Sequence, residues 1–295
     1  MSDEPEKTRP RFDTFSKSVL GHVLEPLGRF EPQKEIVAHP QLADLLFIPS
    51  PKPPRNAHPM LRLLHRMSSR PGLFEPFSRT PTAASLVDVL NKSLNLHRAR
   101  RGRTGYRQAE VWVLSPGKPR KALAEFEARP DTVFEVKGFY RLPKALRMNV
   151  IVIRELPRTP ETLLFRLMGR GTTYKRAVDE LAERMPDDLA MHIASLIKRW
   201  IEVQEHSDQV SDMLTQELID HTRRALEQRD AFIRQQGKAE LLERVVAQRL
   251  GRVLTEPEQE ALRHHITEAG SSDALIAVVL DLTPQQLTEW LAAPG

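Results

Sequence analysis

The stretch from Val150 to Gly171, VIVIRELPRTPETLLFRLMGRG, marks the point at which the sequence changes from one kind of structure to another. Its first residues are β-branched and apolar, which predicts a buried strand. Pro160 then favours the start of a helix, and Gly169 and Gly171 favour its end. We therefore expect the last strand of a sheet here, followed by helices alone.

Upstream of this stretch, amphipathic and strand-like segments alternate. Proline- and glycine-marked turns separate them, as at Pro71-Gly72. We predict helices over residues 12–29, 60–68, 82–101 and 119–129, and strands within 30–50 (two of them), 72–80, 109–116, 133–143 and 148–157. This order predicts a mixed α/β fold, with a central mixed sheet flanked by helices.

Downstream of Thr159 the apolar residues recur with the helical period of 3.6, so an all-α C-terminal half is expected. The predicted organisation has four parts: a disordered N-terminus at 1–11, an α/β domain at 12–172, a helical extension at 173–235 and a small helical unit at 236–295. Apolar stripes on the C-terminal helices predict either core packing or a homo-oligomer interface.

Composition excludes several classes of protein. The chain has no cysteine, which removes disulfides, thiolate metal sites and cysteine nucleophiles. No apolar run approaches the roughly 18–20 residues that cross a bilayer, and the charged start MSDEPEKTRPRFD lacks the apolar core of a secretory signal. We expect a cytoplasmic protein without a membrane partner.

The charges divide unevenly along the chain. Residues 1–150 carry 26 Lys and Arg against 15 Asp and Glu, a net charge of +11, and residues 151–295 carry 18 against 24, a net charge of −6. A basic N-terminal half suits a polyanion such as DNA. The alternative is that the two oppositely charged halves attract each other or keep the protein in solution.

Two carboxylates fall within apolar strand-like segments and are the first candidates for chemistry. Asp44 lies in LADLLF and Glu75 lies in LFEPF. A carboxylate is costly to bury unless it has a partner, and Mg²⁺ is one such partner. Two carboxylates from neighbouring strands could hold Mg²⁺ for phosphodiester hydrolysis. Alternatively, both side chains point to solvent or pair with arginine.

The sequence offers two further candidates for function, and several known motifs are absent from it. Glu135-Val136-Lys137 has the Glu-x-Lys spacing of metal-dependent nucleases, although this tripeptide arises often by chance in so charged a chain. The arginines after His97 suit phosphate contacts, with Tyr106 as a stacking surface, or else form a solvated helix end. The ten histidines lack zinc-site spacing, and there is no P-loop, GxGxxG, GxSxG or HExxH motif. The arginine cluster that follows His97 consists of Arg98, Arg100, Arg101, Arg103 and Arg107.

The chain resembles a group of bacterial proteins related to the Rpn recombination-promoting nucleases and the YhgA-like transposases, a branch of the PD-(D/E)XK nuclease superfamily. The stretches that carry the resemblance are ADLLFIPSP at 43–51, GLFEPFSRTP at 72–81 with the following VDVLNKSLNL, VWVLSP at 111–116, GFYRLP at 138–143 and the opening stretch at 150–171. Together they cover roughly residues 12–185. The segment LLERVVAQRLGRVLTEPEQEAL also resembles the small helical tail of such proteins.

This resemblance implies a PD-(D/E)XK-like sheet and roles for individual residues. Asp44 would be the strand aspartate and Glu75 the acid of the (D/E)xK element, and the two would bind Mg²⁺. The lysine expected two residues later is replaced by Phe77. Some members of the superfamily carry this lysine on the following helix, where Lys92 is the natural candidate.

Three functions therefore remain open. The first is a Mg²⁺-dependent DNA endonuclease with Asp44, Glu75 and Lys92 as catalytic residues and the arginine cluster on the DNA backbone. The second is a catalytically inactive scaffold that binds nucleic acid or protein, with helices in 173–250 as its interaction surface. The third is a protein assembly module. The resemblance suggests a role in DNA mobility or defence, which fold-level analogy does not establish.

Overall fold

The computed structural model describes residues 11–36, 41–50, 58–102, 106–185, 187–205, 213–268 and 272–292. The chain divides into two compact units, one up to Arg223 and one from Arg224 onward. Of the expected disordered N-terminus, all but Arg11 lies outside the described residues. Arg103 also lies outside them.

The first unit is built around one sheet. Its described strands are β1 (Gly28–Ile36), β2 (Gln41–Pro49), β3 (Gly72–Pro76), β4 (Glu110–Ser115), β5 (Arg129–Pro130), β6 (Phe139–Arg141) and β7 (Met148–Val152). They form a seven-stranded sheet in the order β1-β2-β3-β4-β7-β6-β5. The β3–β4 and β4–β7 pairs are parallel, and the other pairs are antiparallel. The sheet is therefore mixed, as predicted.

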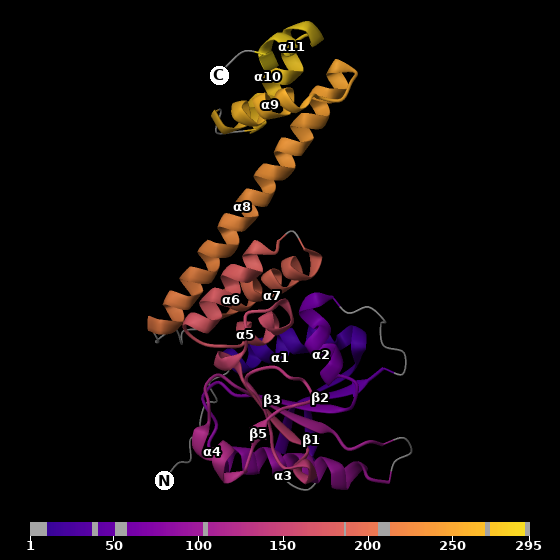
Figure 1. Cartoon of the computed structure of the whole chain (residues 1–295), viewed down its shortest axis with the longest axis vertical. Helices are drawn as coiled ribbons and strands as arrows, with labels where there is room; N and C mark the ends of the chain where they lie inside the picture. Colours follow the sequence, from indigo (N-terminus) through magenta and orange to yellow (C-terminus); the bar gives the residue numbers. More distant parts are fainter. Residues whose placement is uncertain are drawn as a thin grey trace. The chain divides into compact units, whose positions relative to one another are not determined.

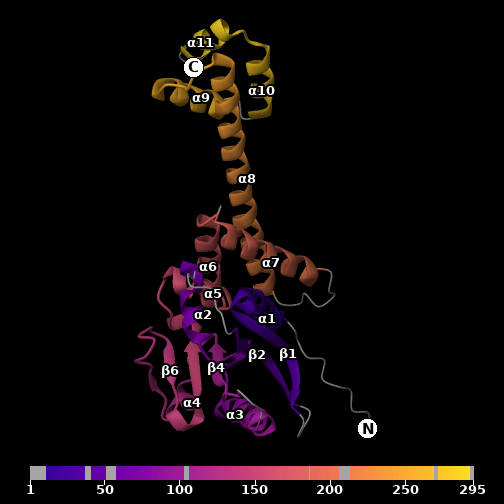
Figure 2. The same cartoon turned by 90° about the vertical axis from the view of Figure 1, so that its right-hand side faces the viewer.

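Helices cover both faces of this sheet (Figures 1 and 2). The helices of the first unit are α1 (Arg11–Leu24), α2 (Arg62–Met67), α3 (Ala83–Arg100), α4 (Arg120–Glu125), α5 (Leu163–Leu167), α6 (Thr172–Glu183), α7 (Asp188–Glu205) and the first residues of α8 (Met213–Leu250). Helices α3 and α4 lie against one face, and α1, α2 and α5 lie on the other side. From Pro160 onward the described regular structure is wholly helical, which confirms the mixed α/β class with a helical C-terminal half.

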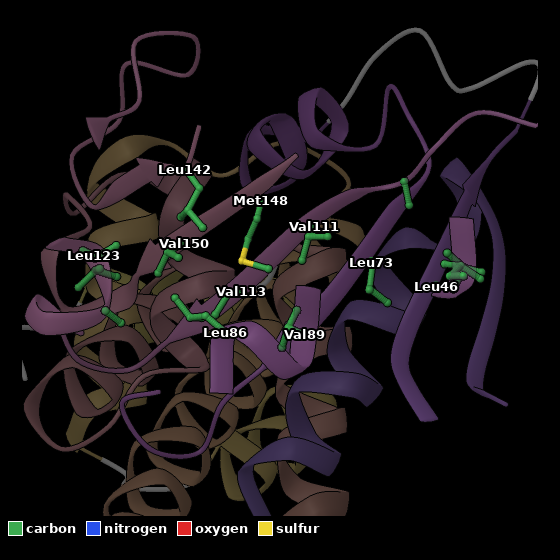
Figure 3. Packing of buried hydrophobic residues seen from close by; sticks show 14 residues of the cluster. Leu46, Leu73, Leu86, Val89, Val111, Val113, Leu123, Leu142, Met148 and Val150 are labelled. Atoms are coloured by element: carbon green, nitrogen blue, oxygen red, sulfur yellow. The ribbon is translucent and has the colours of Figure 1, made fainter. Parts of the chain in front are cut away.

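The core between α3, α4 and the sheet follows from the alternation of side chains along the strands. Leu73, Val111, Val113, Met148 and Val150 point to this face and pack together, and Figure 3 shows them meeting Leu86 and Val89 from α3. Thr82 caps α3, because its side chain accepts a hydrogen bond from the Ser85 N–H and its own N–H donates to the Ser85 hydroxyl. These contacts fix α3 over the centre of the sheet.

The opposite face is aromatic. Trp112 on β4 meets Phe139 on β6 edge-on, with 6.4 Å between ring centroids, and Phe139 meets Phe165 on α5 at the same centroid distance. Phe134 stacks on Phe139 and contacts Trp112. Such edge-on pairs stabilise a core beyond the area they bury. This aromatic cluster therefore connects β4 and β6 to α5.

Several predicted elements are shorter in the structure than expected, and two of them show why. The helix expected to reach residue 29 ends at Leu24 and is followed by a 3-10 turn at Glu25–Leu27 with Pro26 in its first turn. The strand expected over 133–143 is only Phe139–Arg141. The Asp131 carboxylate accepts hydrogen bonds from the N–H groups of Val133 and Phe134, which bends the chain before a strand can form.

The second unit contains the rest of α8 with α9 (Glu256–Glu268), α10 (Ser272–Asp281) and α11 (Pro284–Ala292). Its core joins Leu242 and Val246 of α8 to Leu262, Val279 and Leu287. Helix α8 is continuous through the predicted domain boundary at 235/236. No residue from 227 to 241 of this helix is buried.

Candidate functional site

The two strands that carry Asp44 and Glu75 are antiparallel neighbours in the sheet. Leu45 of β2 pairs with Phe74 of β3. Asp44 directly precedes Leu45 and Glu75 directly follows Phe74, so the structure brings the backbones of the two acidic residues to the same part of the sheet. The side chain of Asp44 lies outside those that the structure describes.

Glu75 is a buried carboxylate with a cationic partner. Its side chain is only 2% exposed, and its Oε2 lies 2.9 Å from Nζ of Lys92. Lys92 comes from α3, the helix that follows β3, and its side chain is 21% exposed. Burying a carboxylate is costly, and the ammonium group of Lys92, 2.9 Å away, offsets part of that cost for Glu75.

Phe77, at the position where a lysine would complete the (D/E)xK motif, belongs to the core. Its ring packs against the apolar cluster between α3 and the sheet. The cationic group beside Glu75 therefore comes from a residue 17 positions further along the chain.

The arginine cluster lies at the far end of α3 from its capped start. Arg98 and Arg101 are exposed, Arg100 is half-buried, and Arg107 is exposed in the segment that leads into β4. Because a helix rises about 1.5 Å per residue, Arg100 is roughly 12 Å along the axis from Lys92. The cluster is thus close to the Glu75–Lys92 pair without being part of it.

The Glu135-Val136-Lys137 tripeptide does not lie in a strand, which corrects the prediction made for it. Glu135 has a φ of 55°, and the turn that follows it contains Gly138 with a φ of 92°. Both side chains of the motif are exposed. They do not share the strand face on which a Glu-x-Lys motif depends.

Sequence reasoning missed a polar cluster at the carboxyl ends of β4 and β7. Tyr140 donates a hydrogen bond to Oε2 of Glu155 at 2.6 Å, and Nζ of Lys118 lies 3.2 Å from Oε1 of the same carboxylate. Lys118 also donates to the Tyr140 hydroxyl. The three residues come from separate segments, and only the adjacency of β6 and β7 could have indicated that they meet.

The electrostatics of this cluster favour a structural role. Burial acts to raise the pKa of Glu155, but the hydrogen bonds from Tyr140 and Lys118 outweigh it, and the pKa lies below its ordinary value. The hydrogen bond to Tyr140 is the main cause that raises the pKa of Lys118. Both shifts stabilise the charged forms, which makes Glu155 a weaker base and Lys118 a weaker acid.

No group of three or more His, Asp or Glu side chains among the described residues is placed to hold a metal ion. None of the helices described here has the length and apolar character needed to cross a membrane. Comparison of the chain with models of known protein families, with curated proteins and with solved structures found no match.

Proposed function

We propose that this chain is a divergent PD-(D/E)XK-like protein whose α/β unit acts on DNA, with Glu75 and Lys92 at the centre of its site. One observation carries the proposal: a lysine on the helix after β3 lies 2.9 Å from the acid of that strand. The resemblance assigns this position to the relocated lysine. In the proposed function, this ammonium group would stabilise negative charge on a phosphate or orient a water.

Mg²⁺ is the metal that the resemblance implies, and its fit to the described residues is partial. Mg²⁺ binds through one or two carboxylates and keeps several waters. Glu75 supplies one carboxylate, and a continuation of the β2–β3 pairing by one residue would set Asp44 opposite it, on the same face of the sheet. When bound there, Mg²⁺ would polarise a phosphodiester and lower the pKa of a water.

The arginine cluster supports the nucleic-acid part of the proposal. Arg98, Arg101 and Arg107 are exposed, at the end of α3 and in the segment before β4. Guanidinium groups suit the phosphate backbone, and contacts of this kind bind without reading sequence. A cytoplasmic location and self-association through the C-terminal helices remain predictions.

A catalytically inactive DNA-binding scaffold is the second candidate, and a specific observation favours it. Glu75 is 2% exposed and already charge-balanced by Lys92, as expected for an ion pair that serves the fold. In this second function the arginine cluster keeps its role, while Asp44 and Glu75 have none in chemistry.

A plasmid-nicking assay separates the two functions. The wild-type chain would be compared, with Mg²⁺ and with a chelator, against Asp44→Ala and Glu75→Gln. Glu183→Gln is the matched control, because Glu183 is an exposed carboxylate on α6. Circular dichroism of each variant would show whether it is folded.

The endonuclease function requires Mg²⁺-dependent nicking by the wild type and by Glu183→Gln that is lost in folded Asp44→Ala and Glu75→Gln. Absence of nicking by the wild type, or equal nicking by wild type and Asp44→Ala, would overturn it. Retention of DNA binding in that case would support the scaffold.

A further inference from the structure

A group of polar side chains lies where α3 ends and where β4 and β7 begin. His97 belongs to the last turn of α3, and Tyr106 lies in the segment that follows, with 5.7 Å between the two ring centroids. Arg147 directly precedes β7, and its guanidinium donates to the carbonyl of Gln108 at 3.4 Å. The carbonyl of Arg147 accepts from the N–H of Val111 at 2.8 Å, which ties the two strand starts together.

Two polar atoms in this group are buried without a hydrogen-bond partner among the described residues. They are Nδ1 of His97 and the hydroxyl oxygen of Tyr106. Buried polar atoms are nearly always hydrogen-bonded, so each exception calls for an explanation. A ligand that is absent from the free protein is one such explanation, and two exceptions side by side make it stronger.

Positive charge surrounds the tyrosine hydroxyl. Burial raises the pKa of Tyr106, while the nearby charges of Arg100 and Arg147 act to lower it. With a net rise, the hydroxyl stays protonated at neutral pH and is available as a donor. The carboxylate of Glu110, at the start of β4, accepts a hydrogen bond from the Asn149 side chain at 3.2 Å.

Arg147 also has an unusual backbone conformation. Its φ of 47° and ψ of 38° are those of a left-handed residue at the end of a 3-10 turn, a position that favours glycine or asparagine. Strained backbone positions of this kind tend to cluster at functional sites. An arginine at this left-handed position is explained if its guanidinium group binds a ligand, which glycine could not do.

We infer that Tyr106, Arg147, Arg100 and His97 form a binding site for a phosphate group of a nucleic-acid strand. The inference rests on the proposed function, since DNA supplies the phosphate. The four side chains offer hydrogen-bond donors and positive charge, which match the acceptor oxygens of a phosphate. The Tyr106 hydroxyl makes no hydrogen bond to a described residue that a phosphate oxygen would have to replace.

Two variants test the site in the full chain. Tyr106→Phe removes only the hydroxyl, and Arg147→Gly removes the guanidinium while placing glycine at a left-handed position. Arg158→Ala is the matched control, because Arg158 is an exposed arginine elsewhere in the unit. Binding of a short fluorescent single strand would be followed by anisotropy over a range of salt concentrations, and the unfolding temperature of each free protein would be measured.

We expect Arg147→Gly to bind about tenfold more weakly than the wild type, and the salt dependence of log K to flatten by about 0.7 for the lost phosphate contact. Tyr106→Phe should weaken binding several-fold. Tyr106→Phe should not unfold at a lower temperature than the wild type, because the hydroxyl has no described partner. Arg147→Gly relieves the left-handed backbone strain but loses the hydrogen bond to the Gln108 carbonyl, so the stability criterion applies to Tyr106→Phe. This combination of weaker binding and unchanged stability distinguishes a ligand site from a structural cluster.

A comparison of strands with a 5′-phosphate and a 5′-hydroxyl identifies the source of the phosphate. A preference for the 5′-phosphate that is lost in the variants would assign the site to a strand end, and an equal loss of affinity for both strands would assign it to the backbone. Wild-type affinity in both variants would overturn the inference, as would a clear loss of stability in Tyr106→Phe. Since no cleavage is measured, failure of the endonuclease function would leave these outcomes unaffected.

Discussion

Replacement of Lys92 by methionine should destabilise the first unit far more than loss of a surface ion pair. The change keeps most of the apolar stem of Lys92 but removes the ammonium group 2.9 Å from Glu75 Oε2. Removing one member of a buried ion pair costs about 3–5 kcal/mol, because the remaining buried charge loses a close counter-charge. The 21% exposure of Lys92 lets some water approach the carboxylate, so we expect a value near the lower end, about 3 kcal/mol.

The measurement is urea-induced unfolding followed by the fluorescence of Trp112, which is buried in the sheet. Trp290, which belongs to the second unit, would be replaced by phenylalanine in every protein compared, so that the signal reports the first unit. Lys175→Met is the matched control, because Lys175 pairs with Glu217, whose side chain is 58% exposed. An exposed pair contributes about 0–1 kcal/mol.

The double variant Glu75→Gln/Lys92→Met tests the cause of the loss. It removes the buried charge together with its partner, so most of the lost stability should return. A cost for Lys92→Met no greater than that of Lys175→Met would refute the reasoning, since it would mean that Glu75 does not need the ammonium group. A double variant as unstable as Lys92→Met would also refute it, because the loss would then come from packing.

Three further results are expected. Gly138→Ala should cost more than about 1 kcal/mol in urea unfolding, because φ is 92° there and an added Cβ would lie 2.9 Å from the Val152 carbonyl oxygen; unchanged stability would contradict the turn geometry. Thr82→Ala should cost about 1 kcal/mol through loss of the cap bond to the Ser85 N–H, whereas Thr82→Asn should retain it. Burial raises the pKa of Tyr174 to about 12 from 10.0. Because the folded value is the higher one, stability is full below pH 10 and falls as the pH rises toward 12. In an absorbance titration, the wild type should show a phenol that ionises late and Tyr174→Phe should lack it. Identical titrations of the two proteins would contradict this.

The fold class could be predicted because periodicity changes sharply along the chain. The β-branched run at Val150 to Val152 and the helical spacing after Thr159 indicated a last strand followed by helices, and these are observed. The boundaries that failed depend on local chemistry that periodicity does not report. The Asp131 carboxylate accepts hydrogen bonds from two backbone N–H groups. The segment after it therefore bends, although its apolar residues predicted a strand.

The candidate site could be predicted only in its sequence-local parts. The position of Glu75 between two phenylalanines indicated a candidate site residue, and the resemblance implied Lys92 on the next helix. The proximity of Tyr106 and Arg147 could not be predicted from the sequence, because it depends on the pairing of β7 with β4. The backbone conformation of Arg147 likewise has no signal in the sequence, since arginine does not favour a left-handed position.

The absence of buried side chains from the middle of α8 has a consequence for how this protein can evolve. From residue 227 to 241 no side chain is buried, and a Cβ added to Gly237 would meet nothing within 4 Å. Substitutions there that keep helical propensity should be nearly neutral, so drift rather than selection would set the identity of these residues. Among descendants of this sequence, we expect this spacer to diverge fastest while its helical character persists.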